Sequence, residues 1–195
     1  MAPKLPTREA WLEKGIDLFR DYFKSHDVTL PSKLKVSCSW SSSRSRITLG
    51  QIYYKTEDGI PQIFISPTLK DPVDVLSVLA HELLHSAFPG EGHQGLFAKA
   101  AHKIGFQSPL TKTTPNAHLT GFCRGLSKVL GEYPHSKVDP TELKKQTTRM
   151  LKIVCPMKCG NFARQSNTMY RTHETFCGCQ IEDGIVNKLK LESEV

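Results

Sequence analysis

The sequence predicts an α+β fold followed by a separate cysteine-rich segment. Two observations support this. Short β-rich stretches lie between amphipathic helical segments, and four of the six cysteines fall in the last quarter of the 195-residue chain. A chain of this length can bury one sizeable core and carry a small appendage. We therefore expect two domains, residues 1–138 and 139–195, with the boundary at Asp139-Pro140.

Four segments have apolar residues at helical spacing. The first runs from Thr7 to about His26, after the start signal of Pro6 and Thr7. The second is strongly apolar: it opens at Asp71-Pro72 and ends at Pro89-Gly90. Further helices are expected over 94–104, which stops at Gly105, and over 119–130. The second helix is apolar enough that it should be buried.

Three β-rich stretches separate the first two helices. They cover residues 34–40, 47–54 and 62–66, and the turn Glu57-Asp58-Gly59 separates the last two. We expect a small sheet that is antiparallel at least in part.

Composition argues against a membrane or secreted protein and leaves the role of a basic region open. No run of eighteen apolar residues is present, so no membrane span is expected, and the N-terminus has no apolar signal-peptide core, which favours the cytoplasm. Residues 99–171 carry 13 Lys and Arg against 3 Asp and Glu within a chain of net charge +7. This region is either a surface for a polyanion such as DNA or an ordinary solvated basic face.

The segment His81-Glu82-Leu83-Leu84-His85 carries the clearest chemistry. Residues four apart on a helix share a face, so the two imidazoles can bind one Zn²⁺. Glu82 can reach the water-occupied position of that ion and accept its proton. Two hydrogen-bonded core histidines beside a salt-bridged glutamate are the structural alternative. However, burying these polar groups in an apolar helix without partners would cost several kcal/mol.

A catalytic zinc site needs a third protein ligand, and His93 is the leading candidate. Two glycines and a proline in residues 86–92 let the chain reverse toward the metal. Glu91, in the same turn, and His102, more than two helical turns further on, are the alternatives.

Residues 81–105 read HELLHSAFPGEGHQGLFAKAAHKIG, which resembles the SprT-like zinc metallopeptidases. This family includes the DNA–protein crosslink protease Spartan, and the similarity is closest to short SprT-like proteins of bacteria and their phages. The similarity extends over the first helix, Trp40 to Ser43, Ile63 to Pro67, Gly131 to His135 and the cysteine-rich tail.

The resemblance implies a minigluzincin-like zincin core, in which a small, mostly antiparallel sheet packs on helices. It implies that His81, His85 and His93 bind the zinc, that Glu82 is the catalytic acid and base, and that the substrate is a protein, often one bound to DNA. Tyr133 or His135, in a stretch shared with these relatives, is a candidate to stabilise the oxyanion.

The four C-terminal cysteines predict a second, structural zinc site of the zinc-ribbon type, in line with the tails of many SprT-like proteins. Cys155 and Cys159 are separated by three residues, Cys177 and Cys179 by one, and seventeen residues separate the pairs. Ribbons usually have two residues within each pair, so His173 competes with Cys179 as the fourth ligand. Free thiols in a disordered tail are the remaining alternative.

Non-specific DNA binding is the expected role of the basic C-terminal half. Tyr170 and Phe176 could stack on bases or form the small core of the ribbon. The candidate phosphate-binding residues are Lys144, Lys145, Arg149, Lys152, Lys158, Arg164 and Arg171.

The sequence thus predicts a monomeric zinc metallopeptidase with a protein substrate, a DNA partner and no membrane. Two rivals stay open. One is a DNA-binding accessory or transcription-linked protein with a structural or vestigial metal centre, and the other is a metal-dependent hydrolase of a non-peptide substrate. The intact Glu82 discriminates against the first rival, because a structural site has no need of that carboxylate.

Overall fold

The computed structural model describes residues 5–41, 48–139, 150–182 and 185–194. The chain divides into two compact units, Met1–Pro140 and Thr141–Val195, and each is described by itself. The boundary expected from the sequence lies beside this division. The predicted α+β class is confirmed, since helices and small sheets share the chain.

Helix α1 (Arg8–Ser25) begins the first unit close to the predicted bounds. The Thr7 side chain caps it by accepting a hydrogen bond from the backbone N–H of Ala10, at 3.1 Å. Its inward face is fully buried and consists mainly of Trp11, Leu12, Phe19 and Phe23.

A three-stranded sheet follows, made of β1 (Lys35–Cys38), β2 (Gly50–Tyr53) and β3 (Gln62–Ile65) in the order β1-β3-β2. The predicted partly antiparallel sheet is confirmed, because β3 pairs antiparallel with β2 and parallel with β1. Ile63 and Ile65 point from β3 into the core and are fully buried. Because the strand order is β1-β3-β2, strand β2 lies at an edge of the sheet. Of the Trp40 to Ser43 stretch, Ser42 and Ser43 lie outside the described residues.

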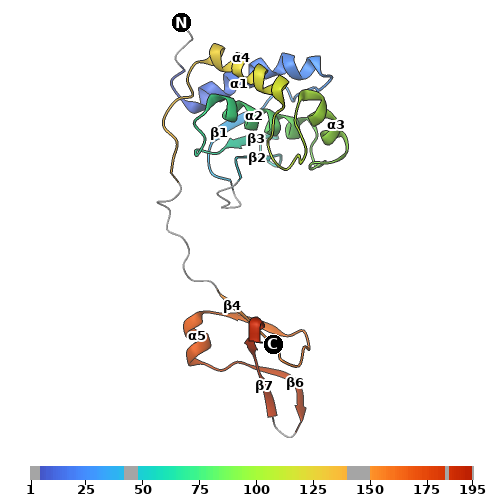
Figure 1. Cartoon of the computed structure of the whole chain (residues 1–195), viewed down its shortest axis with the longest axis vertical. Coiled ribbons are helices and arrows are strands. Elements are labelled where there is room, and N and C mark those ends of the chain that lie inside the picture. Colours follow the sequence, from blue (N-terminus) through green and yellow to red (C-terminus); the bar gives the residue numbers. More distant parts are fainter. Residues whose placement is uncertain (1–4, 42–47, 140–149, 183–184, 195) are drawn as a thin grey trace. The chain divides into compact units, whose positions relative to one another are not determined.

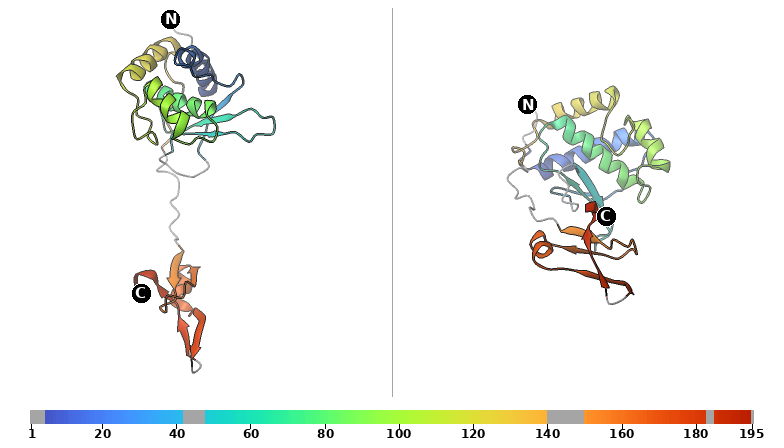
Figure 2. Two further views of the ribbon diagram at one scale, coloured as in Figure 1. Left: turned by 90° about the vertical axis from the view of Figure 1, so that its right-hand side faces the viewer. Right: turned by 60° about the horizontal axis from the view of Figure 1, so that its bottom comes forward.

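Helix α2 (Pro72–Ala87) is the central element of the first unit. It packs on β2, β3, α1, α3 (Gly95–Ile104) and α4 (Ala117–Leu130), as Figures 1 and 2 show. Asp71 caps its N-terminus by accepting from the N–H groups of Val73 and Asp74, and Pro72 occupies the first turn. Eleven of its residues are buried, as its apolar sequence predicts. No helix in the described ranges has the length and apolar character of a membrane span.

The second unit is built of short strands around very little apolar core. One sheet has the order β5-β4-β8, and a hairpin pairs β6 with β7. In the described part of this unit, the buried apolar cluster consists of Ile153, Cys155, Cys177 and Leu189. The elements are β4 (Leu151–Val154), β5 (Phe162–Gln165), α5 (Asn167–Thr172), β6 (Phe176–Glu182), β7 (Ile185–Lys188), β8 (Lys190–Leu191) and a 3₁₀ turn (Glu192–Glu194).

Candidate metal centre

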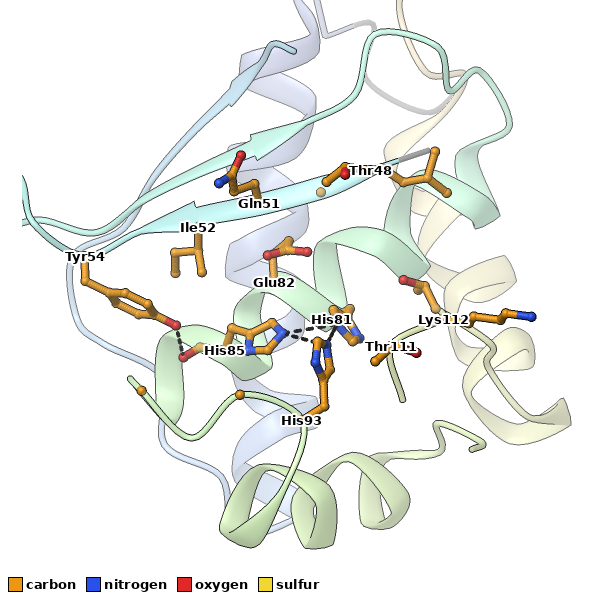
Figure 3. Close-up of a pocket in the computed structure, with 15 residues that line it drawn as sticks. Thr48, Gln51, Ile52, Tyr54, His81, Glu82, His85, His93, Thr111 and Lys112 are labelled. Atoms are coloured by element: carbon orange, nitrogen blue, oxygen red, sulfur yellow. Dashed lines mark hydrogen bonds between the residues drawn. The ribbon is translucent and has the colours of Figure 1, made fainter. Parts of the chain in front are cut away.

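A cavity of about 1020 Å³ opens between the β2 edge of the sheet and helix α2 (Figure 3). Its walls come from four places in the sequence: residues 48–54, helix α2, the turn that contains His93, and the loop 111–113. Figure 3 shows the side chains of His81, His85 and His93 pointing toward one another, with Glu82 beneath β2. The first unit therefore presents an imidazole cluster and a carboxylate to one open space.

The three imidazoles converge on a single point. The Nε2 atoms of His81, His85 and His93 are 3.2 Å apart in every pairing. His81 and His85 lie on one face of α2, four residues apart, and the turn after α2 returns His93 to them. In that turn Gly90 and Gly92 have φ values of 84° and 61°, a backbone region that glycine adopts without strain.

Hydrogen bonds among the rings do not account for this arrangement, and its geometry is compatible with a bound metal ion. A neutral imidazole has one N–H and one lone pair, so three Nε2 atoms in a triangle cannot all be paired with one another. A zinc ion with Zn–N distances of 2.0–2.1 Å and tetrahedral geometry would hold its nitrogen ligands about 3.3 Å apart. The observed spacing of 3.2 Å fits, and the group could hold a metal ion.

Burial keeps these imidazoles in the neutral form that a metal requires. Desolvation, with help from His85 and His93, lowers the pKa of His81 to about 3. Desolvation, followed by the nearby His93, lowers the pKa of His85 to about 4. The pKa of His93 is lowered by burial as well. At neutral pH all three lone pairs are therefore available.

Aromatic packing, which the residue pattern of the metal site did not predict, fixes the ring orientations. Phe97 of α3 is fully buried, stacks on His85 at a centroid distance of 4.2 Å and meets the other two rings edge-on. Phe106 meets His81 at 5.5 Å. His81 Nδ1 is buried and has no hydrogen-bond partner among the described residues, so packing holds this side of the ring. These contacts depend on the tertiary fold.

The Glu82 side chain lines the same cavity and is only 6% exposed. Desolvation raises the pKa of its carboxyl to about 8. A cation held by the imidazoles would act in the opposite direction and favour the carboxylate. Glu82 therefore lies beside the three imidazoles as a carboxyl group whose pKa depends on whether they hold a cation.

Tyr54 also lines the cavity, although no pattern in the sequence predicts it there. Its hydroxyl donates a hydrogen bond to the backbone carbonyl of His85, at 2.8 Å, and so ties the end of β2 to the last turn of α2. Burial, together with the nearby Glu82, raises its pKa to about 12. Tyr54 stays protonated at neutral pH and acts as a donor.

The two alternative third ligands are engaged elsewhere. The Glu91 carboxylate accepts a hydrogen bond from the N–H of Leu96 in the first turn of α3, at 3.1 Å. The His102 Nδ1 atom lies 3.0 Å from the carbonyl of Phe106. Neither belongs to the imidazole group.

The structure does not bring Tyr133 or His135, the candidates for stabilising the oxyanion, to the histidines, because neither residue lines their cavity. Tyr133 is buried edge-on against Trp11, at a centroid distance of 5.0 Å, with the guanidinium of Arg8 over its ring. Both candidates border a separate surface hollow with Lys70 and Lys137. The segment that follows α4 thus packs against α1 through Tyr133.

The second unit gathers Cys155, Cys159, Cys177 and Cys179. All four sulfur atoms lie within 4.8 Å of one another, with Cys155 and Cys179 at 3.4 Å and Cys159 and Cys177 at 3.5 Å. These separations exceed a disulfide bond of about 2.05 Å, and the thiols are free. A tetrahedral Zn–S₄ site with bonds of 2.3 Å has sulfur separations of about 3.8 Å, so the cluster could hold a metal ion.

The local backbone explains how the pairs meet. Cys155 and Cys159 flank the turn between β4 and β5, where Lys158 and Gly160 have φ values of 52° and 89°. Asn161 donates from Nδ2 to the sulfur of Cys177 at 3.2 Å, the main contact that lowers the pKa of this thiol to about 6. His173 caps the end of α5 and lies beside the Thr172 hydroxyl, outside the sulfur cluster.

The candidate DNA-binding residues are spread over the second unit. Lys144, Lys145 and Arg149 lie outside the described residues. Lys152 forms an ion pair with Glu192, Arg171 donates to Asn167 in α5, and Lys158 and Arg164 are exposed. Of the two aromatic candidates, Tyr170 packs against the small core, whereas Phe176 is 47% exposed.

Comparisons with known proteins identify no relative: no family model matches the chain, and neither the curated proteins nor the solved structures contain a match.

Proposed function

We propose that this protein is a zinc-dependent endopeptidase of the SprT-like kind, acting on proteins associated with DNA. One observation carries the proposal. Three neutral imidazoles with Nε2 atoms 3.2 Å apart share a large open cavity with a buried glutamate. Three histidines leave the fourth position of a tetrahedral zinc ion open for water or substrate. This open position distinguishes catalytic from structural zinc sites.

The chain's own residues then have distinct roles. His81, His85 and His93 hold the metal, and Phe97 and Phe106 keep their rings in place. When bound there, zinc supplies Lewis acidity, which polarises a carbonyl group and lowers the pKa of water. Glu82 accepts the proton of the attacking water and passes it to the leaving amine. The cavity of about 1020 Å³ accommodates a stretch of polypeptide.

A carboxylate beside the imidazoles favours this proposal over a purely structural or vestigial metal centre. Burying a glutamate without a partner costs several kcal/mol, and a structural site gains nothing from it. Among the described residues, no carboxylate belongs to the four-cysteine cluster of the second unit, and we assign this cluster a structural zinc.

Replacing Glu82 with Gln tests the enzymatic role. The amide has nearly the same shape but cannot accept the proton, so cleavage of a protein tethered to single-stranded DNA should fall about 10²- to 10⁴-fold. Zinc content should stay at two ions per chain, because no ligand is changed. Cleavage at the wild-type rate by the Gln variant would eliminate Glu82 as the base and the peptidase proposal with it.

We propose further that the second unit binds single-stranded DNA non-specifically through the outer face of its β4-β5 ladder. The ladder pairs Lys152 with Arg164 and Val154 with Phe162, while Ile153 points to the opposite, buried face. Phe162 is 59% exposed, and the Lys152 ammonium lies 5.6 Å from its ring centroid. Cationic side chains can bind the phosphates of a DNA strand, and an exposed aromatic ring beside them can stack on its bases.

Arg164→Ala should weaken DNA binding in low salt and flatten the slope of log K against log salt by about 1. The matched control is Lys14→Ala, on the exposed side of α1 in the first unit. Binding of the wild-type chain that does not change with salt would contradict a phosphate-binding face.

A further inference from the structure

Strand β2 passes close to the helix that carries Glu82 at Gly50. A Cβ atom added to Gly50 would lie 2.6 Å from Glu82 Oε1 and 2.7 Å from Glu82 Cγ. The same atom would lie 2.7 Å from Cγ1 of Val78, one turn earlier on α2. Carbon atoms of side chains do not approach within 3.0 Å without something shifting. A residue with a side chain can therefore occupy this position only if Glu82 or Val78 shifts.

The requirement at Gly50 is for space and not for a special backbone conformation. Gly50 pairs with Ile65 of β3 in the antiparallel ladder and has no positive φ. Alanine could adopt the same backbone without strain. The glycine therefore serves the approach of the strand to the glutamate, as glycine inside a strand often does.

Packing is what locates the Glu82 carboxylate. Among the described residues, no hydrogen bond to Glu82 is found, and its altered acidity comes from desolvation alone. Figure 3 shows the carboxylate lying directly beneath β2, on the cavity side of α2. A long side chain without hydrogen bonds has several accessible rotamers unless its neighbours exclude them. The backbone of β2 at Gly50, with Val78 beside it, is that neighbour.

We propose that Gly50 is a positioning residue for Glu82. By leaving β2 without a side chain at this point, it sets the place of the carboxylate relative to the three imidazoles. A side chain here would push Glu82 away from β2 and out of reach of the attacking water. The inference rests on the proposed peptidase function, in which Glu82 is the proton acceptor.

The test is Gly50→Ala in the full zinc-loaded chain, with Gly125→Ala as the matched control. A Cβ at Gly125, on the exposed side of α4, meets nothing within 4 Å. For Gly50→Ala we expect kcat to fall on the order of 100-fold, a large part of what a general base contributes, with KM and zinc content unchanged. A crystal structure of the variant should show the Glu82 carboxylate displaced from β2. Gly125→Ala should retain the wild-type kcat.

A double variant separates positioning from stability. Val78→Ala removes the methyl group nearest to the new Cβ, so Gly50→Ala with Val78→Ala should melt closer to wild type than Gly50→Ala alone. Its kcat should remain low, because the contact with Glu82 persists.

Wild-type kcat in Gly50→Ala, or a Glu82 carboxylate that keeps its place in the variant's crystal structure, would overturn the inference. So would recovery of kcat together with stability in the double variant. If Glu82→Gln is inactive while Gly50→Ala is fully active, only the positioning role fails. If Glu82→Gln is active, the proposed function fails and the role of Gly50 fails with it.

Discussion

Each of the three imidazoles depends on uncharged neighbours for its orientation. The pairing of His81 with His85 and the place of Glu82 followed from helical spacing, because a helix fixes its geometry locally. His93 followed from the glycines of the turn, and the structure brings it to the other two. The roles of Phe97, Tyr54 and Gly50 could not be predicted in this way, because each residue reaches the site only through tertiary packing. Of the three, only Gly50 leaves a local signal in the sequence, since a glycine inside an apolar strand pattern suggests a close approach of the backbone.

Phe97→Leu tests the role of packing at the residue scale. Leucine keeps much of the apolar volume but loses the flat surface that stacks on His85. Zinc affinity at the histidine site should fall roughly 10-fold, the lower range for residues that orient metal ligands. Competition with a coloured chelator measures it.

Phe64→Leu is the control, since Phe64 contacts Tyr53 on the other face of the sheet from the buried Ile63 and Ile65. Equal zinc affinity in the Phe97 and Phe64 variants, with both folded, would show that the stacked ring has no part in holding the ligands.

At the scale of elements, helices were predicted more accurately than the links between strands. Helix α1 was predicted within a residue or two because its apolar spacing and its cap are local signals. Helix α4 starts at Ala117, two residues before the predicted start, because Asn116 caps it. The parallel pairing of β1 with β3 joins residues far apart in sequence, and no local pattern encodes it. Helix α5 is too short to leave a periodic signal.

The second unit should lose its structure with its metal. Among the described residues, its apolar cluster has only four buried members, two of them cysteines, so apolar burial supplies little of its stability. Cys177→Ser should reduce zinc from two ions to one per chain and abolish protection of the β4 and β5 amides from hydrogen exchange. His173→Ala should keep both ions, because its ring lies outside the sulfur cluster.

Loss of one zinc from the His173 variant would instead make histidine the fourth ligand, as the sequence left open. Full amide protection in Cys177→Ser would mean that the unit folds without its metal.

At the scale of the whole molecule, the chain combines two groups of different chemistry that could each hold a metal ion. The histidines face a cavity, whereas the four cysteines lie in a segment with little apolar core. The separate units and their ligand types could be read from composition and spacing, because soft thiolates and imidazoles select zinc. The cavity could not, since its walls come from four separate stretches of the first unit.

Zinc-edge anomalous diffraction from crystals of the full chain would locate both proposed ions. We expect two peaks, one within about 2.1 Å of the Nε2 atoms of His81, His85 and His93, and one within about 2.3 Å of four sulfur atoms. At the first peak Glu82 should not be a ligand, and no fourth side chain should complete the coordination. A first ion enclosed by four protein ligands, or one bound without His93, would contradict an open zinc site held by three histidines.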